Sequence, residues 1–167
     1  MRFSKNEHIF HESGGVCKIL DIQTAPLEGM PKDRTYYIMQ PVHDPNSVIY
    51  VPVDSDGIFV RRLLDRNEAE DLLAKIEQIE SIDEPNAKLL RAKYIDAMRT
   101  HLPREWIRVI KTVIARMQML ALRSQRISET ERSYYDTAKR HLCTELSLVL
   151  GIESLEVEDL IAEKTPI

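Results

Sequence analysis

The spacing of apolar positions changes at Leu63, which divides this chain of 167 residues into two parts. In the first part, short β-branched or aromatic runs alternate with glycine and proline, a pattern typical of a small and strongly bent all-β unit. The segment 24–33 contains two prolines and a glycine, so we expect a hairpin connection there. The pattern predicts strands over residues 7–10, 16–23, 35–40, 47–53 and 58–61.

In the second part apolar residues recur at helical spacing, and no glycine occurs before Gly151. Asn67 with Glu70, and Ser128 with Glu131, have the spacing of a capping box at a helix start. Gly151 is suited to end the last helix. The pattern predicts four helices with one apolar face each, and hence a compact helical module; they begin near residues 67, 86, 103 and 128.

The second strand of the hairpin in residues 34–53 carries Pro52 among β-branched residues. Proline has no backbone N–H, so it belongs on an edge strand or at a bulge. An apolar strand edge can pair with a foreign strand. This edge is therefore either covered by the protein itself or a docking site.

Charge is segregated along the chain, although the net charge is only −4. Residues 65–84 contain two basic and eight acidic side chains, and residues 88–140 contain thirteen and five. From Cys143 onward one basic side chain stands against six acidic ones. A basic stretch inside an acidic protein points to nucleic acid, and a solvated helix surface is the equally weighted alternative.

Residues suited to catalysis or metal binding are scattered. His8 and His11 fall in a predicted strand or turn, where a three-residue offset points the rings to opposite faces. Cys17 and Cys143 lie far apart and are interpreted as packing residues. Trp106 lies on the apolar stripe of its helix, which favours core packing over base stacking. We therefore expect no enzyme, no metal and no cofactor.

The chain lacks a segment with the length and apolarity of a membrane span, and its start lacks the apolar core of a signal peptide. These features predict a cytoplasmic protein without a membrane partner.

The order of these parts resembles the CarD/CdnL family of bacterial transcription regulators, whose first domain is shared with the transcription-repair coupling factor. The resemblance extends from about residue 3 to residue 152. It rests on four stretches, "FSKNEHIFHESGGVCKILDI", "YYIMQPV…VIYVPVDSDGIFVRRLL", "REWIRVIKTVIARM" and "SETERSYYDTAKRHLCTELSLVLGI".

The resemblance implies an α+β protein, with a Tudor-like all-β barrel over residues 1–64 and a helical domain over residues 65–155. The acidic composition of the end of the chain predicts a tail over residues 156–167. It implies that the first domain binds the RNA polymerase β subunit by strand addition, and that the second contacts promoter DNA and stabilises the open complex. The docking edge would be residues 46–51, and Arg61 matches a basic family position. The expected polymerase-binding residues are Asn46, Val48, Ile49, Tyr50, Val51 and Arg61.

The sequence departs from the family at several positions. Ala25 and Tyr50 stand where family members commonly carry arginine, and the opening has "NEHIFHESGG" in place of the usual "GD.VVYP..G". The family often wedges a tryptophan into the minor groove from the segment that matches residues 85–90, which here contains none. Trp106 belongs to the following helix.

We therefore expect a non-enzymatic transcription regulator that tethers to RNA polymerase through the β module and contacts promoter DNA through the basic helices. No set of base-reading residues is evident, which favours recognition of the DNA backbone. The alternative is a protein–protein adaptor without direct DNA binding; neither reading involves a small-molecule substrate. The candidate phosphate contacts are Lys88, Arg91, Lys93, Arg104, Arg108, Lys111, Arg132 and Lys139.

Overall fold

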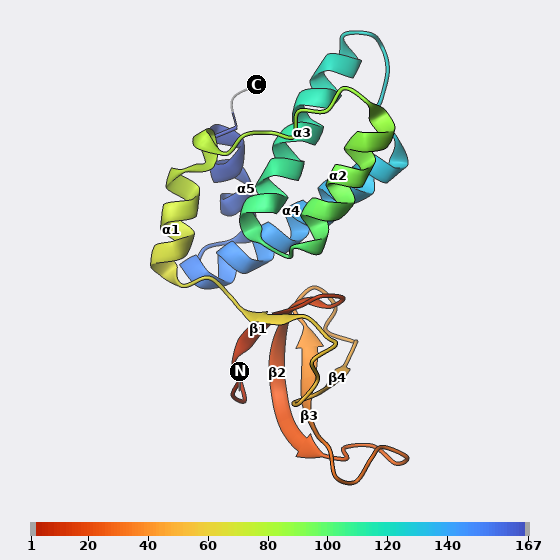
Figure 1. Cartoon of the computed structure of the whole chain (residues 1–167). Coiled ribbons are helices and arrows are strands. Elements are labelled where there is room, and N and C mark those ends of the chain that lie inside the picture. Colours follow the sequence, from red (N-terminus) through yellow and green to blue (C-terminus); the bar gives the residue numbers. More distant parts are fainter. Residues whose placement is uncertain (1–2, 166–167) are drawn as a thin grey trace. The chain divides into compact units, whose positions relative to one another are not determined.

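The computed structural model describes residues 3–165, which divide after Leu63 into two compact units (Figure 1). The first unit is an antiparallel sheet with the strand order β4-β3-β2-β1-β5. All five predicted strands are confirmed to within two residues at each end. Their bounds are β1 (His8–His11), β2 (Gly15–Thr24), β3 (Thr35–Pro41), β4 (Ile49–Pro52) and β5 (Val60–Arg62).

The sheet is open within the described residues. Its order ends at β4, which pairs with β3, and at β5, which pairs with β1. The α+β class is therefore confirmed, whereas the closed Tudor-like barrel implied by the family resemblance is not, because the two edge strands do not pair with each other. This leaves two strand edges in the first unit.

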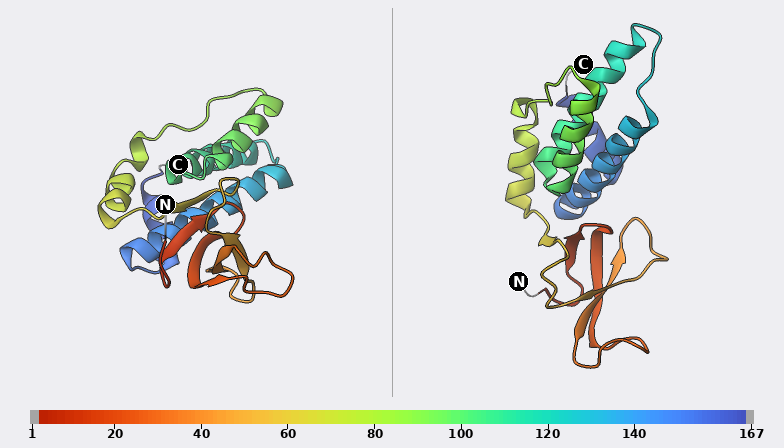
Figure 2. Two further views of the ribbon diagram at one scale, coloured as in Figure 1. Left: turned by 60° about the horizontal axis from the view of Figure 1, so that its bottom comes forward. Right: turned by 45° about the vertical axis from the view of Figure 1, so that its right-hand side comes forward.

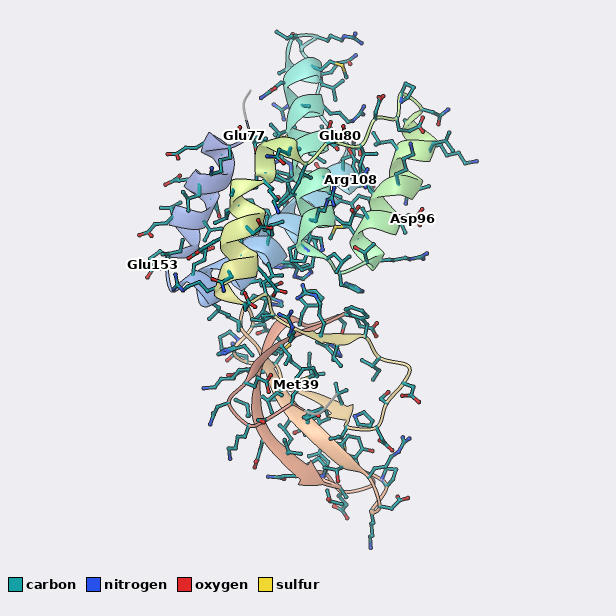
Figure 3. All side chains as sticks on the ribbon, turned by 60° about the vertical axis from the view of Figure 1, so that its left-hand side comes forward. Met39, Glu77, Glu80, Asp96, Arg108 and Glu153 are labelled. Carbon is teal, nitrogen blue, oxygen red and sulfur yellow. The ribbon has the colours of Figure 1, made fainter. Side chains whose placement is uncertain are left out.

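One face of the sheet carries the core of this unit. Ile9, Cys17, Ile19 and Met39 are fully buried there, and Figure 3 labels Met39 on its strand. The register between β2 and β3 shifts between Ile19 and Asp21, which bends β2 over the core. The side chains that enclose this core alternate along each strand, as the period of a strand requires.

Helices are the regular secondary structure of the second unit within residues 64–165, and no strand occurs there (Figure 2). Helices α3 and α4 make its core, in which Trp106, Ile107, Leu142 and Leu146 are buried. Helices α1, α2 and α5 pack against this pair. The bounds are α1 (Arg66–Ala74), a 3-10 helix η1 (Ile76–Gln78), α2 (Ala87–Arg99), α3 (Pro103–Ala121), α4 (Glu129–Leu150) and α5 (Ser154–Glu163).

The helix ends follow local capping chemistry. The predicted capping box of Ser128 and Glu131 is confirmed, and Gly151 ends α4 in the left-handed conformation at φ 71°. The predicted cap of α1 at Asn67 is wrong. Asp65 caps this helix by accepting a 2.8 Å hydrogen bond from Glu68 N–H, and the Glu68 carboxylate accepts one from Asp65 N–H, also at 2.8 Å. Asp65 with Glu68 and Asn67 with Glu70 have the same three-residue spacing, so the spacing does not distinguish the two candidate caps.

Helix α5 includes residues 156–163, which the sequence analysis predicts to be part of an acidic tail. Its Val157 and Ile161 are buried, and α5 packs against α4. Residues 154–163 therefore belong to the helical unit, because two apolar positions one turn apart give the acidic segment a face that the bundle covers. Residues 166 and 167 of the predicted tail lie outside the described residues.

Gly14 lies against side chains of the core of the first unit. A Cβ atom at this position would lie 2.6 Å from Ile49 Cδ1 and 2.8 Å from Cys17 Sγ, closer than real contacts allow. We expect Gly14→Ala to lower the free energy of unfolding by about 1–3 kcal/mol, the usual cost of overpacking a core. Chemical denaturation measures the change. Gly57→Ala is the matched control, because nothing lies within 4 Å of its Cβ position, and an equal loss in both variants would contradict this packing.

Candidate functional site

Backbone groups of β4 face β3 and the outside of the sheet in alternation. The Val53 N–H donates a 2.9 Å hydrogen bond to the Thr35 carbonyl, which makes these two residues a hydrogen-bonded pair. The antiparallel register then makes Tyr37 with Val51, and Met39 with Ile49, the next hydrogen-bonded pairs. The backbone groups of Val51 and Ile49 are thereby occupied by β3.

The residues between these pairs point their backbone groups away from β3. Tyr50 and Pro52 occupy the non-bonded positions opposite β3, so the Tyr50 N–H and carbonyl face outward. The Pro52 carbonyl accepts a 3.2 Å hydrogen bond from the Ser55 N–H in the following turn. Pro52 has no N–H to leave unpaired there, which explains its tolerance within the strand. Val48 continues the same alternation and is 45% exposed. We call these outward groups of residues 48–52 the β4 edge.

Side chains of the predicted polymerase-binding residues are divided between the core and the surface. Val51 is 3% exposed, so its side chain is not available to a partner, and Ile49 is partly buried against the same core. Val48 and Tyr50 remain at least partly exposed, and Asn46 is exposed in the preceding turn. We therefore expect a partner at this edge to contact mainly Val48 and Tyr50, the residues beside Ile49 and Val51.

The turn before β4 is fastened by side-chain hydrogen bonds. Asp44 accepts from the Asn46 N–H at 3.3 Å and from the Ser47 hydroxyl, and its carbonyl accepts from the Ser47 N–H at 3.1 Å. Gln40 Nε2 donates to the Pro45 carbonyl at 2.6 Å. These contacts fix the path of the chain into the β4 edge.

At the opposite edge of the sheet, formed by β5, an arginine side chain binds an outward backbone carbonyl. Glu12 N–H donates to the Phe59 carbonyl at 3.1 Å, so the backbone of Arg62, at a non-bonded position of β5, faces outward. Arg61 Nη1 donates to the outward Arg62 carbonyl at 2.9 Å, and its guanidinium carbon lies 4.7 Å from the centroid of the Phe10 ring. Arg61 thus caps its own strand, and β4 is the edge better suited to pairing.

Three of the eight candidate phosphate contacts form ion pairs inside the helical unit. Lys93 Nζ lies 3.0 Å from Glu84, Arg108 Nη1 lies 2.9 Å from Glu105, and Lys139 Nζ lies 2.6 Å from Glu158. Hydrogen bonding to Glu158 raises the pKa of Lys139, and the Lys93 hydrogen bond lowers the pKa of Glu84. Figure 3 shows Arg108 on α3 and Asp96 on the adjacent α2, and both line one shallow pocket.

Lys111 supports the chain that follows α1. Its Nζ donates to the carbonyls of Ile76, Glu77 and Ile79 at 3.0, 3.4 and 2.6 Å. These carbonyls belong to η1 and the residue after it, where a helix end leaves acceptors without intrahelical partners. Lys111 is therefore a positioning residue for this segment.

The remaining four candidates, Lys88, Arg91, Arg104 and Arg132, have no ion pair or hydrogen bond from their side chains within residues 3–165. Arg104 lines a groove with the acidic residues of α1. Lys88, Arg91 and Arg132 lie in the first turns of α2 and α4.

The first turns of α2 and α4 lie beside each other, because Ala87 and Arg91 line one pocket with Ser128 and Thr130 (Figure 2). Arg126, two residues before the Ser128 cap, is also exposed and without a side-chain partner in the described part of the chain. Sequence reasoning missed it, although its position just before a capping box is visible in the sequence. We call Lys88, Arg91, Arg126 and Arg132 the cationic end.

The other sequence candidates have structural roles. Trp106 is 0% exposed, as its place on the apolar stripe predicts. Cys17 and Cys143 are buried and free, and burial raises the pKa of each thiol to about 11. His11 is buried, and its Nδ1 accepts a 3.1 Å hydrogen bond from the Gly14 N–H. Within the described residues, no group of three acidic, histidine or cysteine side chains could hold a metal ion.

These features define a class of protein. It has a sheet domain with an unpaired edge, followed along the chain by a helical unit. Residues 3–64 match the family model of the CarD-like/TRCF RID domain, an RNA-polymerase-interacting domain. The match supports an interaction with RNA polymerase. No curated protein matches the chain. None of the helices in residues 3–165 has the length and apolarity to cross a membrane.

Replacing Lys111 by methionine keeps the aliphatic stem and removes the ammonium donor. We expect Lys111→Met to lower the free energy of unfolding by about 1–3 kcal/mol, since two partly buried carbonyls and one exposed carbonyl lose a charged partner. Arg104→Met, on the same helix and without a side-chain partner in the described residues, should change it by less than about 0.5 kcal/mol. Chemical denaturation of both variants tests the assignment, and equal effects would refute it.

Proposed function

We propose that this protein is a transcription regulator that binds the RNA polymerase β subunit through the β4 edge and contacts promoter DNA through the cationic end. The single observation that carries the proposal is the family match of residues 3–64, together with the outward backbone of β4 in that domain. In this role the protein modulates the stability of the open promoter complex. No catalytic step is involved.

Strand addition suits the chemistry of the β4 edge. The edge offers the N–H and the carbonyl of Tyr50 to an incoming strand. Backbone hydrogen bonds need little side-chain identity, so the family arginines absent at Ala25 and Tyr50 are not required. Pro52 has no N–H, so the row of outward N–H donors along β4 ends before it. This limits the length of the partner strand that can pair and sets its register.

Phosphate contact suits the cationic end. Lys88, Arg91, Arg126 and Arg132 are exposed and unpaired within the described residues, so binding DNA does not require them to leave a carboxylate. Leu89, which is 54% exposed, lies between Lys88 and Arg91 in the segment where the family often carries its wedge tryptophan. Leucine is among the apolar side chains that enter the minor groove, and we assign the groove contact to Leu89.

The Tyr50→Pro variant removes the outward N–H of β4. Tyr50 occupies the same non-bonded position as Pro52, so the substitution breaks no hydrogen bond to β3. We expect the full chain to bind RNA polymerase at least tenfold more weakly, about 1.4 kcal/mol, because a partner carbonyl loses its donor. Surface plasmon resonance with immobilised polymerase measures the affinity.

The control is Tyr50→Phe, which retains the backbone N–H and should bind within about twofold of the wild type. Val48→Pro removes the preceding outward N–H and should also weaken binding. Thermal melting verifies that each variant is folded. Unchanged binding by both folded proline variants would exclude strand addition at this edge.

Free and ion-paired cations give a matched comparison for DNA binding. The triple variants Lys88→Gln/Arg91→Gln/Arg132→Gln and Lys93→Gln/Arg108→Gln/Lys139→Gln lose the same number of positive charges. We expect only the first to bind the duplex more weakly, and the magnitude of its salt slope to fall by about 2.7, since each phosphate contact contributes about 0.9. Fluorescence anisotropy across a salt series measures both slopes.

Equal losses in the two triple variants would indicate a nonspecific effect of net charge. The absence of duplex binding by the wild-type chain would favour the alternative function, a protein–protein adaptor. Retention of polymerase binding in both triple variants is expected, because the β4 edge is unaltered.

A further inference from the structure

A groove of about 570 Å³ lies in the helical unit between α1 with η1 on one side and the start of α3 on the other. Leu72 and Ile79 line it from the first side, and Leu102 and Pro103 line it from the second. Leu102 leaves 48% of its side chain exposed there. The groove therefore offers apolar surface that the helical unit does not cover itself.

The exposed leucine of this groove occupies a position that disfavours leucine. Leu102 is the N-cap residue of α3, and its side chain accepts no hydrogen bond from the first turn. Serine, threonine, aspartate and asparagine are preferred at this position because their side chains can accept one. The preceding His101 has a φ of 55°, in the left-handed region that non-glycine residues rarely adopt. A local choice that lowers stability is expected where function requires it.

The two walls of the groove differ in charge. On the α1 wall, Asp71 forms an ion pair with Lys75 at 2.7 Å, and Glu68 adds a negative charge. On the α3 wall, Arg104 has no ion-pair partner in the described residues. A complementary ligand therefore carries a cation toward α1 and a carboxylate toward α3, with apolar side chains between them.

The charge around α1 disfavours DNA as the ligand of this groove. Residues 65–84 contain eight acidic and two basic side chains. Figure 3 labels Glu77 and Glu80 on the segment that follows α1, and both are exposed. A surface of this sign repels phosphate groups. An apolar groove with charged walls instead suits an amphipathic protein segment, whose apolar face lies against the groove.

We propose that this groove binds an amphipathic segment of RNA polymerase, with apolar side chains against Leu72 and Leu102, a lysine or arginine toward Glu68 and a carboxylate toward Arg104. This inference rests on the proposed function and adds a second polymerase contact to that of the β4 edge. Leu64 lines the groove and is also the last residue of the stretch that matches the RNA-polymerase-interacting domain. Since the first contact already holds the polymerase, a weak second contact suffices.

The test measures binding of the full chain to DNA-free RNA polymerase by surface plasmon resonance. Leu102→Asn removes the apolar side chain and supplies a favourable helix cap, so we expect binding at least threefold weaker and a melting temperature no lower than that of the wild type. Arg104→Glu should weaken binding to a similar extent. The matched control is Leu122→Asn at the other end of α3, which is 90% exposed, does not line the groove and should bind as the wild type does.

Unchanged binding by both groove variants would overturn this inference and leave the β4 edge untouched, whereas the absence of wild-type binding would overturn the proposed function as well. A lower melting temperature for Leu102→Asn would show that this leucine serves folding and would also overturn the inference.

A photo-reactive benzoylphenylalanine in place of Gln78, an exposed residue of the groove, identifies the ligand. We expect a cross-link to a polymerase subunit. A cross-link between two copies of this chain would overturn the inference, because the groove would then be a dimer interface.

Discussion

The unpaired backbone of an edge strand is the constraint on which the first unit depends. Tyr50 occupies a position of β4 that faces away from β3, so its N–H and carbonyl are left without a partner in the described residues. The same strand places Ile49 and Val51 in the core, where Gly14 leaves room for Ile49. An edge that is anchored by its side chains and open along its backbone is well suited to accept another strand.

The helical unit shows how pairing decides which charges are available. Acidic side chains form ion pairs with Lys93, Arg108 and Lys139. Backbone carbonyls accept hydrogen bonds from Lys111. Of the candidate cations without a partner in the described residues, three lie near the starts of α2 and α4, and Arg104 lies at the start of α3. In the proposed function the polymerase tether raises the local concentration of DNA, so a few phosphate contacts are enough.

Much of the fold is readable from the sequence because the signals are local. Strand positions follow from β-branched runs between breakers, and the end of α4 follows from Gly151. The burial of Trp106 follows from its apolar stripe. The start of α1 was misplaced because Asp65 and Asn67 each have an acidic residue three positions later, and the local pattern is the same for both.

The sequence by itself determined the two-part division, the strand edge at Pro52 and the concentration of positive charge in one stretch. Tertiary structure alone decided that the sheet stays open, that α5 packs on the bundle and that Lys111 binds carbonyls more than thirty residues earlier in the chain. The physical reason is range. Propensity and capping act between neighbours, whereas ion pairing, burial and the meeting of two helix ends depend on segments that only folding brings together.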